Sequence, residues 1–195
     1  MTLTAPKFAT YADLLALPEH VVGEILDGEL VVSPRPAPRH ARASSLLGMD
    51  LAPFQFRRKG GSGPGGWQIL DEPELHFGRN VMVPDLAGWT LERLPRLPDT
   101  AWFELAPDWV CEVVSPSSAR IDRVRKMPKY AAEGVAWLWL VDPLAQTLDA
   151  FRLHEGSWLL LGSWGGGAVA RVQPFDAIEL DLTGWWQDPE PAEVP

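Results

Sequence analysis

Short hydrophobic stretches of strand length recur along the chain and predict a protein rich in β-structure. Two of them flank Asp27-Gly28 within residues 21–32, which is the pattern of a β-hairpin with a two-residue turn. Further apolar or β-branched runs, each long enough for one strand, lie at 73–77, 81–89, 109–115 and 135–141. After them, runs separated by glycine-containing turns predict a C-terminal β-meander over 147–153, 157–164 and 168–173.

Helical spacing of hydrophobic residues occurs in three places. Thr10 is in position to cap a short helix over 11–15. Residues 39–56 carry apolar side chains at helical spacing, and Pro53 is expected to kink or shorten this helix. A third helix is predicted over 118–133, and the order strand, helix, strand around it indicates a crossover unit. We therefore expect an α/β fold with a mixed sheet.

The composition fits one folded domain. The chain has 195 residues, of which 46% are hydrophobic, and 10 of them are tryptophans. That is enough to form a core, and it excludes a disordered protein. We predict a single domain over residues 1–186 and a disordered, acidic and proline-rich tail over 187–195.

Two features of the sequence bear on the cellular compartment, namely the cysteine content and the length of the longest apolar run. Cys111 is the single cysteine, which excludes an intramolecular disulfide and a cysteine-based zinc site. Strand alternation directs it away from the face of Glu112, and we interpret it as a buried, inert thiol. No secretory signal is visible, and the longest apolar run, 135–141, is far shorter than the ~20 residues of a membrane helix. We expect a cytoplasmic protein without a membrane partner.

The net charge of −9 argues against binding of nucleic acid over the whole surface. The basic residues, however, concentrate in residues 35–42, 57–59 and 120–129. This distribution predicts a localised basic cleft on an acidic body, with contacts that salt weakens.

Three acidic residues, Glu24, Asp85 and Glu112, each lie within an apolar strand-like run. A buried, unpaired carboxylate costs several kcal/mol, so each needs a partner or an exposed position. One interpretation is that each faces outward or forms half of an ion pair. The other is that they converge, in which case a cation must lie between them. Mg²⁺ suits such a site, because it binds one or two carboxylates together with water and phosphate oxygens.

Lys126 follows Glu112 on the predicted helix, and it also has two interpretations. It could be a solvated lysine paired with Asp122 one turn earlier. Alternatively, it could lie beside the carboxylates, where it would orient an attacking water or stabilise charge on phosphorus. The sequence alone does not separate the two.

The order of several short segments is specific. They are Gly23 to Val31, Ser33-Pro34 leading to His40, Val83 to Ala87, and Pro107 to Ser118 continuing through Asp122, Lys126, Tyr130 and Gly134-Val135 to Trp139–Pro143. Over roughly residues 10–155 this ordered set resembles the Uma (Uma-two) family of bacterial restriction-endonuclease-like proteins, within the PD-(D/E)XK nuclease superfamily.

The resemblance implies a restriction-endonuclease-like core, with a mixed central sheet flanked by helices and a divalent-metal site. Asp85 corresponds to the aspartate of the PD element, Glu112 to the acidic residue of the (D/E)XK element, and Glu24 to the acidic residue of the first motif. The backbone carbonyl of Val113 is a further candidate ligand. These residues would hold Mg²⁺ or Mn²⁺ directly or through water.

The lysine departs from the superfamily pattern, because Val114 stands two residues after Glu112. Lys126 matches the place to which this family has moved the lysine. Pro128 could kink the helix nearby, which leaves Lys129 and Arg123 as alternatives.

The remaining candidates have weaker patterns. His40 matches a family position and is a possible substrate contact, as is Arg123, although a histidine at a helix start is more often structural. We interpret Tyr130 as a packing residue whose hydroxyl is hydrogen-bonded. Trp67 belongs to the core, or could stack on a base.

Two functional hypotheses follow from this pattern. The first is a Mg²⁺-dependent endodeoxyribonuclease in which Asp85, Glu112, Glu24 and Lys126 are catalytic and DNA is the substrate. The second is a catalytically inactive nuclease-fold module that binds a nucleic acid or a protein. A homodimer is compatible with either hypothesis, and the tryptophan-rich edge of the meander could supply its interface.

Overall fold

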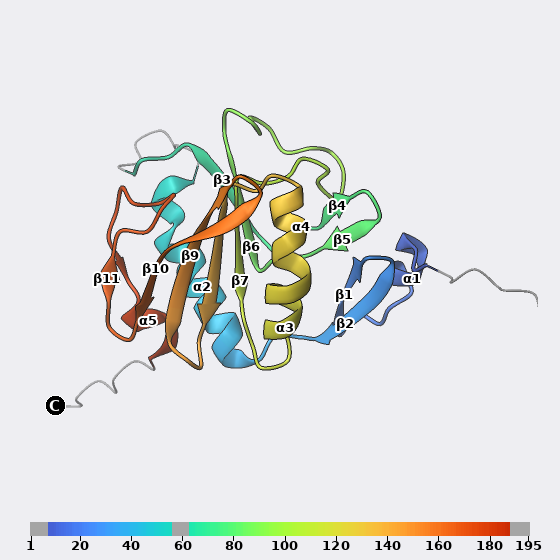
Figure 1. The fold of residues 1–195 in the computed structure, drawn as a ribbon, viewed down its shortest axis with the longest axis horizontal. Coiled ribbons are helices and arrows are strands. Elements are labelled where there is room, and N and C mark those ends of the chain that lie inside the picture. The colour runs from blue at the N-terminus through green and yellow to red at the C-terminus, as the bar shows by residue number, and fades with distance from the viewer. Residues whose placement is uncertain (1–7, 56–62, 188–195) are drawn as a thin grey trace, which may run out of the picture.

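A mixed six-stranded β-sheet forms the centre of the protein (Figure 1). The computed structural model describes residues 8–55 and 63–187. The strands lie in the order β10-β9-β8-β7-β6-β3, and their bounds are β3 (Trp67–Asp71), β6 (Leu86–Thr90), β7 (Trp109–Val113), β8 (Trp137–Asp142), β9 (Thr147–His154) and β10 (Ser157–Gly165). β7 and β8 run parallel, whereas the other neighbours run antiparallel. The first two strands of the predicted meander are confirmed as the antiparallel pair β9 and β10, whereas the third predicted strand lies outside this sheet.

The parallel pair is joined by the predicted crossover. The helix expected over 118–133 consists of α3 (Ala119–Ile121), the π-helical turn η2 (Asp122–Lys126) and α4 (Met127–Ala132). Gly134, with φ of +76°, follows its last turn, where a residue with a left-handed backbone is needed. The crossover unit is confirmed by the register of β7 on β8.

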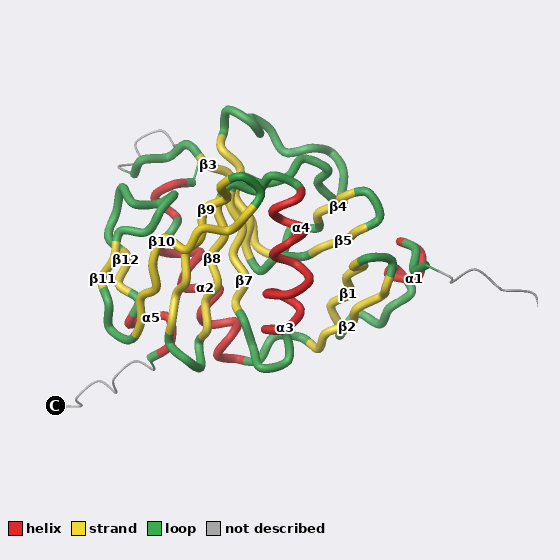
Figure 2. The backbone as a smooth tube through the Cα atoms, viewed as in Figure 1, coloured by secondary structure: helices red, strands yellow, loops and turns green. Residues whose placement is uncertain are grey.

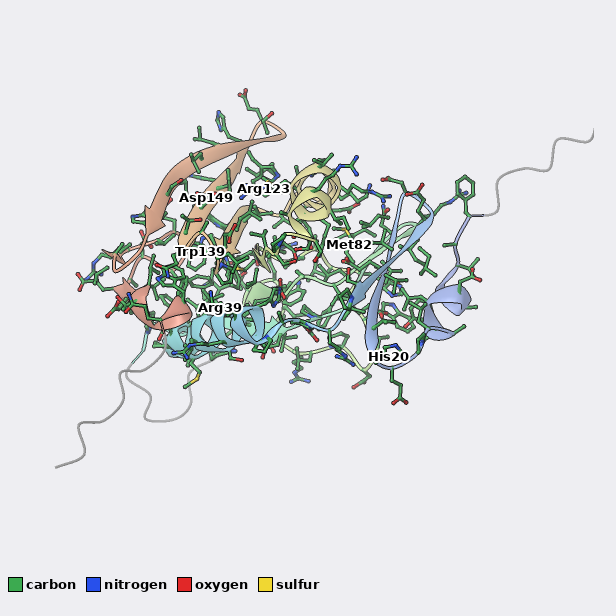
Figure 3. The ribbon with its side chains drawn as sticks, turned by 90° about the horizontal axis from the view of Figure 1, so that it is seen from below. His20, Arg39, Met82, Arg123, Trp139 and Asp149 are labelled. Carbon is green, nitrogen blue, oxygen red and sulfur yellow. The ribbon has the colours of Figure 1, made fainter. Side chains whose placement is uncertain are left out.

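Helices cover both faces of the central sheet. In β7, Trp109, Cys111 and Val113 pack into the hydrophobic cluster that includes α2 (Pro38–Asp50), whereas Val110 packs into the cluster that includes Tyr130 of α4. Seen along the sheet, α2 and α4 lie on opposite sides of it (Figure 3). Because both faces are buried, the strand is a continuous apolar run rather than an alternating one. Glu112 interrupts this run on the α4 side.

A second, four-stranded sheet stands beside the first, in the order β2-β1-β5-β4 (Figure 2). Its strands are β1 (Val21–Leu26), β2 (Glu29–Pro34), β4 (Leu75–Phe77) and β5 (Asn80–Met82). The predicted hairpin is confirmed, with φ of 55° at Asp27 and 80° at Gly28, as a tight primed turn requires. Ile25 pairs with Val81, so β1 joins the hairpin to the middle of the chain.

The strand predicted over 81–89 is wrong as a single element. It is divided into β5 and β6, which belong to different sheets, by the segment Val83-Pro84-Asp85. Pro84 has no N–H to donate to a ladder, so a continuous central strand is disfavoured there. The break places Asp85 between the two sheets.

Several other strands and helices differ from their predicted bounds. β3 was not predicted, and the strand expected over 168–173 is only β11 (Val169–Ala170), which pairs with β12 (Leu180–Asp181). The helix expected over 39–56 ends at Asp50 and continues as the 3-10 turn η1 (Ala52–Phe54), as Pro53 leads one to expect. The remaining helices are α1 (Tyr11–Leu15), which Thr10 caps as predicted, and α5 (Thr183–Trp186).

Two of the predictions, the basic segment 57–59 and the tail from 188, lie outside the described residues. Within the described part, no helix is long and apolar enough to span a membrane.

Candidate active site

The ammonium group of Lys126 lies between two carboxylates. Its Nζ is 3.0 Å from Oε1 of Glu24 and 2.8 Å from Oε1 of Glu112. It also donates a hydrogen bond of 3.1 Å to the backbone carbonyl of Val83. The lysine and both glutamates are buried, so all three charges depend on one another for compensation. Lys126 therefore faces Glu112 and not the solvent.

A π-helical turn directs Lys126 inward. The N–H of Met127 donates to the carbonyl of Asp122, five residues earlier, rather than to the carbonyl four residues earlier. Pro128 follows directly and has no N–H to continue a regular α-helical ladder, which accounts for the irregularity at this point. Within the turn, Asp122 and Lys126 are the buried residues, and both are polar.

Further hydrogen bonds hold the two glutamates. The Tyr130 hydroxyl donates to Oε1 of Glu112 at 2.6 Å, and the N–H of Val83 donates to Oε1 of Glu24 at 2.8 Å. The interpretation of Tyr130 as a packing residue with a bonded hydroxyl is thereby confirmed. Val83 contributes both its N–H and its carbonyl, so the irregular segment between β5 and β6 is part of the network.

Asp85 is anchored to the strand that carries Glu112. Its Oδ2 accepts a hydrogen bond of 2.7 Å from the N–H of Val113, the residue after Glu112. Its Oδ1 lies 3.2 Å from Nε2 of His40, which comes from the first turn of α2. Asp85 is thus brought beside β7 from one side and beside α2 from the other.

The buried network has more carboxylates than cations. Burial raises the pKa of Glu112 well above its ordinary value; Lys126 opposes this effect, and neighbouring carboxylates reinforce it. Burial also raises the pKa of Asp122, again against the effect of Lys126. Burial alone would lower the pKa of Lys126, but Glu112 and Glu24 outweigh it and raise the pKa, so the ammonium stays protonated. A further cation would relieve this excess of negative charge.

His40 and Asp85 lie at one end of a groove of about 620 Å³ that follows α2 as far as Gln55. Burial would lower the pKa of His40, but Asp85 and the backbone of Val113 raise it overall. Nδ1 of this histidine is buried and has no hydrogen-bond partner among the described residues.

The described basic residues do not form one cleft. Arg125 and Lys129 pair with Asp27 on the β1–β2 turn, and Arg123 lies 3.7 Å from Asp149 of β9. Figure 3 shows Arg39 on α2 and Arg123 on opposite sides of the sheet. The prediction of a single localised basic cleft is therefore wrong for these residues, because the sheet separates the helices that carry them.

The predicted metal ligands are distributed unevenly over this arrangement. Within residues 8–55 and 63–187, no three His, Cys, Asp or Glu side chains are grouped to hold a metal ion. Glu24 is held by Lys126 and Val83, whereas Asp85 lies just before β6 and is hydrogen-bonded to the residue that follows Glu112 in β7. The three carboxylates predicted to converge on a cation are therefore not gathered into one group, because Lys126 lies between Glu24 and Glu112.

Comparison with known proteins identifies the family. Residues 8–183 match the family model Uma2, described as putative restriction endonuclease. The chain belongs to the Uma2 family. No curated protein matches the sequence.

The Uma2 fold is also seen in a solved structure. The crystal structure of a putative nuclease belonging to DUF820 from Anabaena variabilis superimposes with a TM-score of 0.69 at 22% identity, covering 92% of this chain and 99% of that one. The mixed sheet flanked by helices is accordingly a restriction-endonuclease-like fold, as the resemblance implied.

Sequence reasoning missed two parts of the site. It considered Asp122 only as a surface partner of Lys126, in one of two interpretations, whereas Asp122 is buried beside Lys126. It also did not include the Tyr130 hydroxyl among the groups that hold Glu112. Asp122, Lys126 and Tyr130 recur at intervals of four residues, which places them along one helix face and could have signalled both.

Proposed function

We propose that this protein is a Mg²⁺- or Mn²⁺-dependent endonuclease that hydrolyses DNA phosphodiester bonds. The observation that carries the proposal is the ion pair between Lys126 and Glu112. Asp85 lies beside it, because its carboxylate is hydrogen-bonded to the N–H of Val113, the residue after Glu112. The match to a family described as putative restriction endonuclease supports it.

Asp85 and Glu112 are the residues that we propose hold the cation. Tyr130 and Lys126 both contact Oε1 of Glu112 and fix the carboxylate that would bind the cation. The Val113 carbonyl would add a neutral ligand, and Glu24 would act through water or through Lys126. A bound divalent cation supplies a water of lowered pKa and neutralises charge on the phosphoryl oxygens.

Lys126 contributes a permanent positive charge that is already in place before substrate binds. Three acceptor oxygens, from Glu24, Glu112 and Val83, fix its position. Preorganised charge of this kind stabilises a developing phosphorane without reorganisation at the moment of reaction. Glu24 is then a positioning residue for the ammonium group.

His40 is our proposed contact to the phosphate at the mouth of the groove, because it lies on Asp85 and its position is fixed by α2. Arg123 is more exposed and turned toward Asp149. We propose Arg123 only as a contact to the DNA backbone that flanks the cleavage site.

The test is a cleavage assay with purified protein on duplex and single-stranded DNA, with Mg²⁺, with Mn²⁺ and with chelator. We expect metal-dependent cleavage by the wild-type protein and none by Asp85→Ala or Lys126→Ala. Lys129→Ala is the matched control, because Lys129 lies on the same helix but pairs with Asp27. Cleavage that persists in Asp85→Ala would contradict the proposal. DNA binding without cleavage under all conditions would instead favour an inactive nuclease-fold module.

A further inference from the structure

The groove along α2 begins at residues of the candidate active site and continues well beyond them. His40 and Asp85 line one end of it, and it runs between α2 on one side and residues of β3 and β6 on the other. The helical rise from His40 to Gly48, which also lines it, is ~12 Å, so the groove is longer than a phosphate group. Its volume of about 620 Å³ is typical of sites that bind a small organic molecule.

Small residues form the middle of the α2 wall, among them Ser44, Ser45 and Gly48. A Cβ atom added at Gly48 would lie 3.5 Å from Cδ2 of Leu86 and 3.6 Å from Oδ1 of Asp71. The Asp71 carboxylate therefore reaches across the groove toward the helix. Because a side chain larger than alanine at position 48 would occupy this space, the glycine helps to keep the groove open.

Asp71, the last residue of β3, offers hydrogen-bond acceptors to this groove. Its side chain has no hydrogen-bond or ion-pair partner within residues 8–55 and 63–187. Glu72 and Asp85 line the groove as well, whereas no lysine or arginine of the described segments does. A phosphate inside the groove would be repelled by these carboxylates, but a neutral group that carries N–H donors would be attracted.

We propose that the groove binds the base of an unpaired nucleotide next to the scissile phosphate, and that Asp71 accepts a hydrogen bond from an amino group of that base. The inference rests on the proposed function, which places the phosphate on His40 at the mouth of the groove. A nucleobase is uncharged and flat. Cytosine and adenine carry exocyclic amino groups that a carboxylate can accept from, whereas thymine presents a carbonyl oxygen and a methyl group instead.

The inference defines the class of DNA that is cleaved. A base that is paired and stacked in a duplex cannot enter a groove in the protein, and extruding it costs free energy that an unpaired base does not require. We therefore expect the substrate to be DNA with an unpaired nucleotide at the cleavage site, with cytosine or adenine preferred there.

The first test measures binding by fluorescence anisotropy, with Ca²⁺ as the divalent cation. The probe is a labelled duplex with one unpaired position that holds cytosine, thymine or an abasic site. We expect the dissociation constant for unpaired cytosine to be at least about tenfold lower than for thymine or for the abasic site. The fully paired duplex should bind as weakly as the abasic one.

Variants assign this preference to the groove. Asp71→Asn replaces one acceptor oxygen by an amino group at unchanged size, so cytosine and thymine should then bind within about twofold of each other. Asp99→Asn, at an exposed residue outside the groove, should keep the preference for cytosine. Ser45→Phe should reduce the affinity for unpaired cytosine to that for the abasic site, because the ring occupies the groove. Leu97→Phe, at a loop leucine that is 51% exposed, should not.

Cleavage of the same DNA molecules with Mg²⁺ separates this inference from the proposed function. Equal cleavage of paired and unpaired DNA, or equal affinity for cytosine and the abasic site, would overturn the inference and leave the nuclease proposal standing. Selective binding of unpaired cytosine without cleavage would support the base site and contradict the nuclease activity. A protein that binds none of these molecules would overturn the inference as well.

Discussion

Lys126 and Glu112 form an ion pair in which Nζ lies 2.8 Å from Oε1, and it links the crossover between β7 and β8 to β7 itself. Glu112 lies in the buried strand, and Lys126 lies in the π-helical turn that returns over it. The position two residues after Glu112 is occupied by Val114, which is buried in the apolar cluster around Tyr130. The positive charge beside Glu112 therefore comes from Lys126 on the helix and not from the position two residues later, which is Val114.

Substitution of Lys126 by methionine should destabilise the protein and abolish cleavage. Glu24 and Glu112 would then be buried without compensation, and breaking a buried ion pair in this way costs about 3 kcal/mol. Urea denaturation of Lys126→Met measures the free energy of unfolding. For comparison, Lys129→Met should cost less than about 1 kcal/mol, because Asp27, its partner, is mostly exposed. Equal decreases in the free energy of unfolding would show that the buried ion pair stabilises the protein no more than the exposed one.

Asp85 and Glu24 should respond differently when metal binding is measured. We expect Asp85→Asn to weaken Mn²⁺ binding by at least about tenfold in titration calorimetry, because it removes a proposed ligand charge. Glu24→Gln should retain Mn²⁺ affinity within a few-fold and lose cleavage, because Glu24 contacts Lys126. If Glu24→Gln loses the metal as completely as Asp85→Asn does, Glu24 is a direct ligand.

The Tyr130 hydroxyl should matter for the orientation of Glu112. Tyr130→Phe keeps the buried ring and removes the 2.6 Å hydrogen bond to the carboxylate. Hydrogen bonds to charged groups contribute about 1.5 to 3 kcal/mol, so we expect a stability loss of that order. We also expect a weaker Mn²⁺ affinity, measured by calorimetry on the folded variant. An unchanged affinity would assign Tyr130 a purely structural role.

Pro128 should determine the direction of Lys126. In Pro128→Ala the new N–H can bond the carbonyl four residues earlier, which favours a regular α-helix over the π-helical turn. We expect cleavage to fall about tenfold or more. We also expect the free energy of unfolding to decrease, because a displaced Lys126 leaves Glu24 and Glu112 buried without compensation. Wild-type cleavage rates in this variant would show that the proline does not set the lysine in place.

Several parts of the fold could be predicted because they depend on local interactions. The Asp27-Gly28 turn follows from the backbone conformations that these residues tolerate, and the hairpin follows from the turn. The crossover follows from a helix placed between two strands. The strand at 81–89 was misjudged, since periodicity does not show that Pro84 divides it between two sheets.

The sequence by itself determined which residues could carry chemistry: carboxylates within apolar runs and a lysine on the helix that follows. Only the tertiary structure decided how they combine. Glu24 reaches Lys126 because β1 pairs with β5 and so lies near the β5–β6 break, a contact between segments far apart in the chain. The basic segments, close in composition, are separated because the sheet stands between α2 and α4. Long-range pairing of strands sets both outcomes, and no local pattern encodes it.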